Sequence, residues 1–161
     1  MSADALPLPP SSIGEAALRD AQKIADRIAA DEAAAVDARQ AYEVYGLPAI
    51  EPDEAARSIL APGELLHATH ASALLEAHAL GEEEALPRGG TLYLTSTRVL
   101  HLGAETTELR LSEIDEVTVA LERLVLIRLR DGSDLAVEVD QPRLLRVQLV
   151  TSLAGVRAAQ P

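Results

Sequence analysis

Four histidines are the side chains in this sequence that could bind a metal ion or transfer a proton near neutral pH. His67 and His70 are three positions apart in a segment that is predicted to be a strand. Residues an odd number of positions apart point to opposite faces of a strand, so these two cannot bind one ion together. His78 lies in an acidic segment and His101 in a later predicted strand. We therefore expect separate histidines and no metal site.

The sequence contains serine, acidic residues and glycine, which hydrolases and nucleotide-binding enzymes use, but these residues lack the spacing that such chemistry needs. No serine stands in a Gly-x-Ser-x-Gly turn. The neighbouring carboxylates Asp115 and Glu116 would point to opposite faces of a strand. No glycine-rich loop is followed by a lysine, and Lys23 is the single lysine of the chain. We expect a protein without catalytic residues and without a cofactor.

Composition limits the classes of partner. The chain has 161 residues, 48% of them hydrophobic, with no Phe, Trp or Cys, so the core must be aliphatic. Its net charge of −12 opposes binding to nucleic acid and to anionic lipid head groups. No run of about 20 apolar residues could span a membrane, and the first residues lack the charge pattern of an export signal. We expect a cytoplasmic protein.

The N-terminal third is predicted to be one long helix after a short disordered segment. Residues 1–11 are rich in proline and are predicted to be disordered. Ser12 and Glu15 have the spacing of a capping box, which begins the helix. Gly46, followed by Pro48, is typical of a helix end, so the helix is expected over 12–46.

Apolar residues of this helix follow a repeat of alternating four and three positions, which is typical of a coiled coil. Asp31 interrupts the repeat, and most of the contact residues are alanine. Two arrangements are open: the stripe packs against its own domain, or it pairs with a second copy or another protein. The candidate contact residues are Ala17, Ala21, Ile24, Ile28, Ala35, Ala38, Tyr42 and Tyr45, and we call this set the seam.

A connector over 47–61, with a short helix over 52–60, leads to a C-terminal domain over 62–161. Alternating apolar patterns predict seven strands in this domain, and Pro142 and the Asp140-Gln141 pair predict the start of a last helix. The leucines of that helix recur at helical spacing and would close the open end of a barrel. The expected strands are 64–75, 91–95, 99–102, 108–111, 116–121, 125–129 and 135–139, and the helix is 144–158.

The C-terminal domain resembles the pleckstrin-homology (PH)-like superfold, especially its GRAM and bacterial PH branches. The resemblance covers about 62–159 and rests on the order of several motifs rather than on one of them. It implies an α+β fold: a seven-stranded, partly open β-barrel capped by a C-terminal helix, which recognises proteins or lipids without catalysis. The motifs are Pro62-Gly63-Glu64, Gly90-Thr-Leu-Tyr-Leu-Thr95 with Arg98-Val99-Leu100, Leu111-Ser-Glu-Ile-Asp-Glu-Val117 and the Asp131-Gly132 turn.

One segment departs from the lipid-binding members of that superfold. The resemblance places a basic, phosphate-binding loop between the first two strands, over 76–90 of this chain. Here that loop contains Glu82, Glu83 and Glu84 in a row, and their carboxylates would repel a phosphate. Binding of phosphoinositides by the usual loop is therefore not expected.

Charge is uneven along the domain. Residues 62–122 contain 11 acids and 3 arginines, whereas residues 123–161 contain 6 arginines and 4 acids. The arginines are either ordinary solvated side chains or a weakly positive face for a partner, beside the apolar pair that lies off the core stripe of the last helix. This candidate partner face consists of Arg123, Arg128, Arg130, Arg143, Arg146, Leu144 and Val147.

These observations predict a non-enzymatic interaction module, a scaffold or adaptor with a helical extension that packs or self-associates. Its expected partner is a protein or a second copy of the chain, with no nucleic acid. The alternative function is a GRAM-like module that binds a membrane surface, which the acidic loop and the charge of −12 oppose.

Overall fold

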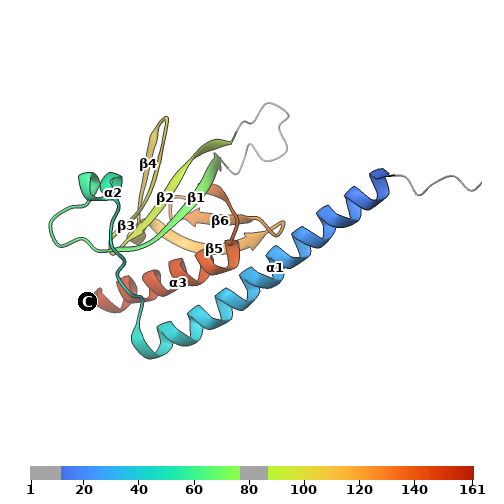
Figure 1. Ribbon diagram of the computed structural model, residues 1–161. Helices are drawn as coiled ribbons and strands as arrows, with labels where there is room; N and C mark the ends of the chain where they lie inside the picture. Colours follow the sequence, from blue (N-terminus) through green and yellow to red (C-terminus); the bar gives the residue numbers. More distant parts are fainter. Residues whose placement is uncertain (1–11, 77–86) are drawn as a thin grey trace, which may run out of the picture.

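The computed structural model describes residues 12–76 and 87–161. It confirms the expected α+β architecture, with a long N-terminal helix, an antiparallel sheet of seven strands that does not close, and a C-terminal helix (Figure 1). The predictions for 1–11, for His78 and for the glutamates 82–84 lie outside the described residues. The elements are α1 (Ser12–Tyr45), α2 (Glu54–Ile59), β1 (Leu66–Glu76), β2 (Arg88–Thr95), β3 (Arg98–Gly103), β4 (Thr106–Arg110), the 3-10 turn η2 (Leu111–Glu113), β5 (Ile114–Ala120), β6 (Leu124–Leu129), β7 (Asp134–Val139) and α3 (Pro142–Ala159).

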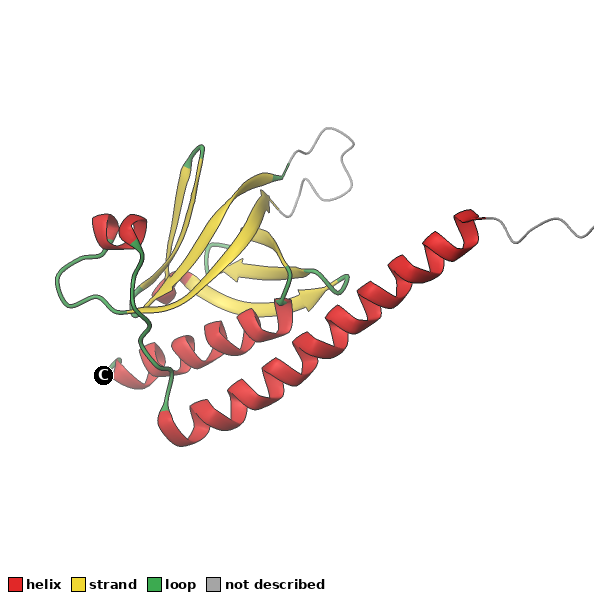
Figure 2. Cartoon of the chain, viewed as in Figure 1, coloured by secondary structure: helices red, strands yellow, loops and turns green. Residues whose placement is uncertain are grey.

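The strands form one sheet in the order β4-β3-β2-β1-β7-β6-β5. Every neighbouring pair is antiparallel, and β1 joins the two halves because it pairs with both β2 and β7. The sheet curls around α3, so one face is concave (Figure 2). The edge strands β4 and β5 are linked by η2 and do not pair with each other in the described sheet.

The concave face and α3 enclose the main core. Leu145, Leu149 and Leu153, which recur at helical spacing, are buried against the sheet. Alternate residues of the strands meet them, such as Leu92 and Leu94 in β2. With no Phe or Trp in the chain, this core consists of Leu, Val, Ile and Ala side chains.

The convex face carries a smaller core beneath α2. Leu66, Tyr93 and Leu100 point to this side of the sheet and pack against Ala56 of α2. Asp53 caps α2 by accepting the Ala56 N–H at 2.7 Å, and its other oxygen accepts the Tyr93 hydroxyl at 3.0 Å. The expected connector helix is thus tied to the sheet by one carboxylate.

The long helix α1 forms an outer layer against α3, so α3 lies between α1 and the sheet (Figure 1). The two helices run in the same direction, since Asp31 lies at the start of α3 and Gly46 beside its last turns. α1 ends as expected: Gly46 has φ +74°, a conformation that glycine adopts without strain, and its N–H bonds the carbonyl of Tyr42.

Candidate functional site

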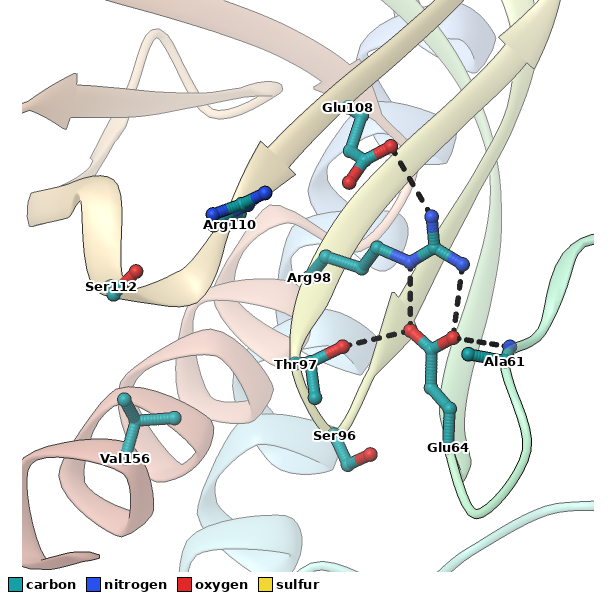
Figure 3. Close-up of a pocket in the computed structure, with 9 residues that line it drawn as sticks. All are labelled: Ala61, Glu64, Ser96, Thr97, Arg98, Glu108, Arg110, Ser112 and Val156. Atoms are coloured by element: carbon teal, nitrogen blue, oxygen red, sulfur yellow. Dashed lines mark hydrogen bonds and ion pairs between the residues drawn. The ribbon is translucent and has the colours of Figure 1, made fainter.

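The Pro-Gly-Glu and Leu-Thr-x-x-Arg motifs, more than 30 residues apart in the sequence, meet in one ion pair (Figure 3). Arg98 donates to the two oxygens of Glu64 from Nε and Nη2, at 2.8 and 2.9 Å. The hydroxyls of Thr95 and Thr97 and the N–H of Ala61 donate to the same carboxylate at 2.6 to 2.9 Å. The Glu64 side chain is only 4% exposed. This network fixes the entry to β1 against the β2–β3 turn.

The network also sets the charge of its members. The hydrogen bonds from Arg98 lower the pKa of Glu64 to about 2, although burial alone would raise it. Glu64 therefore remains a carboxylate with its oxygens fully engaged by donors. Such a group neither accepts a proton near neutral pH nor attacks a substrate, so its role is structural.

A surface hollow of about 460 Å³ lies beside this ion pair. Glu64, Arg98 and Glu108 form one wall, and Arg98 joins the two carboxylates because its Nη1 lies 3.2 Å from Glu108 Oε2. Arg110 and Val156 line the other side (Figure 3). The two carboxylates and two guanidinium groups balance in charge, so the hollow has no strong preference for an anion or a cation.

The contact between α1 and α3 is built on Asp31, the residue that interrupts the seam. Its side chain is buried, and its two oxygens accept the backbone N–H groups of Arg143 and Leu144 at 2.9 and 3.1 Å. These N–H groups lie in the first turn of α3, where a helix leaves donors free. Asp140 and Gln141 were expected to cap α3. Instead the side chain of Gln141, at the N-cap position, makes no capping hydrogen bond with any described residue, and Asp31 supplies the cap from another helix.

The guanidinium group of Arg143 compensates the buried charge. It lies 3.7 Å from Asp31 Oδ2 and 3.7 Å from Glu32 Oε1, and it also donates to Glu122 in the β5–β6 turn. The hydrogen bond to Glu122 is the main reason that the pKa of Arg143 is raised. One arginine thus joins α1, α3 and the β5–β6 turn.

The seam divides at Asp31. C-terminal to it, Ala35 and Ala38 are buried against Val147, and Tyr42 is partly buried in the same cluster beside Leu144. Leu144 and Val147, proposed from the sequence as part of a partner face, lie beneath α1. The final seam residue, Tyr45, is 87% exposed. For this half of the helix, the structure shows packing against the chain's own domain.

N-terminal to Asp31, α1 extends past the start of α3 (Figure 2). We call residues 12–30 the arm. Its seam residues Ala17 and Ala21 are exposed, Ile24 is 51% exposed and Ile28 is half-buried. Leu18, beside the seam, is 73% exposed. The arm is therefore a helix with an unpaired apolar stripe among the described residues.

The arginines of the candidate partner face are largely engaged by carboxylates of this chain. Arg128 lies 3.4 Å from both Glu116 and Asp134, and Arg123 lies 4.0 Å from Glu138. The side chain of Arg130 is exposed near the β6–β7 turn. The positive charge is thus spread over several elements rather than gathered into one site.

Two arginines of α3 instead cover the edge of the sheet. Arg146 donates from Nε to the carbonyl of Val117 at 3.1 Å, and Arg157 donates to the carbonyl of Asp115 at 2.9 Å. Residues 115 and 117 lie in β5, and alternate carbonyls of an edge strand point away from its neighbour. These acceptors are therefore not free to pair with an added strand.

The described histidines lie apart from one another. His67 bonds the carbonyl of Pro48 through Nδ1, and His70 bonds Gln148 of α3 through Nε2. His101 is buried in β3. Within residues 12–76 and 87–161, no three His, Asp or Glu side chains come close enough to hold a metal ion. The same ranges contain no helix that is both long and apolar enough to cross a membrane.

Sequence reasoning missed the roles of Asp31 and Leu121. Asp31 was noted as a defect of the repeat, and a lone acid in an apolar stripe is the signal that could have identified a buried cap. Leu121 has φ +53° and is 73% exposed in the β5–β6 turn. A positive φ at leucine has no sequence signal, because glycine and asparagine are the residues that usually mark such turns.

Comparison with known proteins leaves the chain without an assigned family. No family model matches it, and no curated protein matches it in sequence. Among solved structures, the C-terminal domain of an unknown protein from Leishmania infantum is similar, with 16% identity, a TM-score of 0.48, and coverage of 58% of this chain and 87% of that one. A structure described by mutations in SsgB that correlate with longitudinal cell division during sporulation of Streptomyces coelicolor has 13% identity and a TM-score of 0.33, and covers 65% of this chain and 94% of that one. Both TM-scores lie below 0.5, so the description of this small β-sheet fold rests on the topology of the chain itself.

Proposed function

We propose that this protein is a non-enzymatic interaction module of PH-like fold whose arm binds a second copy of the chain. The body supplies a rigid support, because the sheet, α3 and the second half of α1 form one packed unit. The arm supplies the contact. The partner in this proposal is therefore a second copy of the same protein, and the proposed activity is self-association without catalysis.

One observation carries this proposal: the seam that packs α1 on α3 continues past the point where α3 begins. Ala35 and Ala38 are buried by α3, whereas Ala17, Ala21 and Ile24 continue the same stripe without a covering element among the described residues. A long helix gains most of its stability from packing of its apolar stripe. A second helix on this stripe would extend an interface that the chain already uses.

The assignment to the PH-like superfold is part of the proposal. It is supported by seven antiparallel strands followed by one helix on the concave face. It is also supported by the Glu64–Arg98 ion pair, since both residues come from the motifs on which the resemblance rests. The ion pair explains why the two motifs occur together, because each motif supplies one of its two residues.

Binding to an anionic membrane is less well supported than binding to a protein. The phosphate of a lipid head group is held by clustered arginines or lysines. Here Arg128 and Arg143 contact carboxylates of the same chain, and Arg146 bonds the backbone of β5. Co-sedimentation with phosphatidylserine vesicles at low salt tests this alternative, and we expect the protein to stay in the supernatant.

The main test is the mass of a seam variant in solution. Ile24→Asp places a charge in the exposed stripe, so we expect it to convert a dimer into a monomer in light scattering. Val44→Asp is the matched control. Val44 lies in the same helix, is 71% exposed and is outside the arm, so this variant should keep the mass of the original protein.

In dilute solution, where the original protein is also a monomer, circular dichroism of Ile24→Asp should show an unchanged melting curve, because Ile24 is not part of a core cluster. A monomeric original protein at concentrations up to about 1 mM, the weak end of measurable association, would overturn the proposal. An Ile24→Asp variant that keeps the dimer mass would do the same.

A further inference from the structure

We infer that two arms pair antiparallel, with Asp20 of each copy against Arg27 of the other. This inference rests on the proposed self-association and goes further, because it fixes the direction, the register and the charge contacts of the pair. Three separate observations lead to it: the position of α3 on the seam, the length of the arm, and the charged residues beside the seam.

Shape excludes the parallel arrangement. A partner helix on the seam of the arm would lie in line with α3, since α3 occupies the same stripe from Asp31 onward. In a parallel, in-register pair, the partner's α1 would have to continue through the space of α3 for the rest of its length. An antiparallel partner runs the other way, and its own body lies beyond the free end of the arm.

Length fixes the register. Seam-to-seam packing gives all four seam residues of the arm a counterpart when Ala17 faces Ile28 and Ala21 faces Ile24 of the other copy. In this register Gly14 lies opposite Asp31, which is where α3 begins. The arm therefore fills the seam up to the start of α3 and stops there.

Charge supports this register. In an antiparallel coiled coil, the residues on one flank of the seam face those on the same flank of the partner. Asp20 and Arg27 lie on one flank, so the register above places Asp20 of each copy against Arg27 of the other, twice per dimer. Arg27 is half-buried in the single chain, and the carboxylate of Asp20 from the second copy would be a suitable partner for its guanidinium group.

The opposite flank is apolar in the same arrangement. Leu18 lies there, and so does the β5–β6 turn, because Glu122 of that turn shares Arg143 with Glu32 of α1. The N-terminal part of a partner's arm would pass this turn. Leu18 and Leu121 are each 73% exposed in the single chain.

A charge cycle tests the inference by sedimentation velocity over a concentration series. Asp20→Arg and Arg27→Asp each place two like charges together, so each should weaken the dimer by about tenfold. The double variant Asp20→Arg with Arg27→Asp restores opposite charges and should recover most of the affinity. Asp26→Arg has the same change of charge on the far side of the arm, and we expect it to leave the dissociation constant unchanged.

Cysteine cross-linking reports the direction independently, since the chain has no cysteine of its own. Two copies of Ala17→Cys would be about 16 Å apart in the antiparallel pair and should not form a disulfide. A mixture of Ala17→Cys and Ile28→Cys should form one. If the protein is a dimer but Ala17→Cys cross-links with itself, or the double charge variant is not restored, the antiparallel inference is wrong while self-association stands. If the protein is a monomer at all concentrations, both the antiparallel inference and the proposed self-association are wrong.

Discussion

Asp31 of α1 accepts hydrogen bonds from the N–H groups of Arg143 and Leu144, so one helix caps another that begins more than 100 residues later. The same carboxylate lies at the boundary between the covered and the exposed parts of the seam. A residue that weakens the coiled-coil pattern is therefore the residue that fixes where α1 docks.

This cap predicts a loss of stability when Asp31 is changed. Asp31→Ala should lower the free energy of unfolding by about 2 kcal/mol, because it removes two hydrogen bonds to a helix start and leaves the donors buried. Asp31→Asn keeps an acceptor and should cost less. Urea denaturation followed by circular dichroism measures both, and Asp37→Ala, on an exposed position of α1, is the control. Equal stability of Asp31→Ala and Asp37→Ala would show that the cap does not hold α1 in place.

The Glu64–Arg98 ion pair predicts a larger loss. Glu64→Gln leaves Arg98 without its main counter-charge at a site where the carboxylate is 4% exposed, so the cost should be about 3 kcal/mol. The exposed pair of Arg88 and Glu105 is the matched comparison, and Glu105→Gln should cost less than about 0.5 kcal/mol. Similar urea midpoints for the two variants would contradict a structural role of Glu64.

The same ion pair predicts how stability depends on acid. The pKa of Glu64 is lowered from 4.5 to about 2, so the folded protein binds a proton less readily than the unfolded chain. Its stabilising contribution is complete above pH 4.5 and is lost as the pH falls from 4.5 towards 2. Unfolding free energies measured across this window should fall more steeply for the original protein than for Glu64→Gln. Parallel curves would show that Glu64 does not titrate as the structure implies.

His101 predicts a second, milder dependence on pH. Burial lowers its pKa, the nearby charge of Arg88 acts in the same direction, and the backbone of Ser72 opposes both only in part. The unfolded chain therefore gains a proton near pH 6.5 that the folded protein does not take up, and stability decreases as the pH falls below 6.5. Melting temperatures between pH 7.5 and pH 5 should fall less for His101→Leu than for the original protein. A slope that does not change on substitution would rule out His101 as the titrating group.

The sequence predicted the elements of the fold well because each has a local signal. The alternation of apolar residues located the strands to within two residues at most ends, and β2, which begins at Arg88 rather than at Thr91, is the larger difference. The extra residues are two glycines and an arginine, which carry no alternating pattern. At Gly90 the reason is tertiary: a side chain there would collide with the carbonyl of Leu102 in β3.

The surface was harder to predict, because it depends on which element covers which. Leu144 and Val147 have the spacing of an exposed pair on α3, and only the docking of α1 explains why Val147 is buried. In the same way, Arg146 belongs to a group of arginines that is typical of a partner face, yet its guanidinium donates a hydrogen bond to a backbone carbonyl of β5. The burial of Val147 and the hydrogen bond of Arg146 both depend on contacts between segments far apart in the chain. A local sequence pattern carries no information about such contacts.

Leu121 gives the last prediction, because it adopts a conformation that costs stability. Its φ of +53°, followed by +57° at Glu122, is that of a tight hairpin turn in which asparagine is preferred at the first position. A leucine there costs on the order of 1 kcal/mol, and its side chain is 73% exposed, so packing in the single chain does not offset that cost. Leu121→Asn should therefore raise the melting temperature of the monomer in dilute solution. Thermal unfolding followed by circular dichroism at low protein concentration measures this effect. A lower melting temperature in dilute solution would show that Leu121 stabilises its own chain.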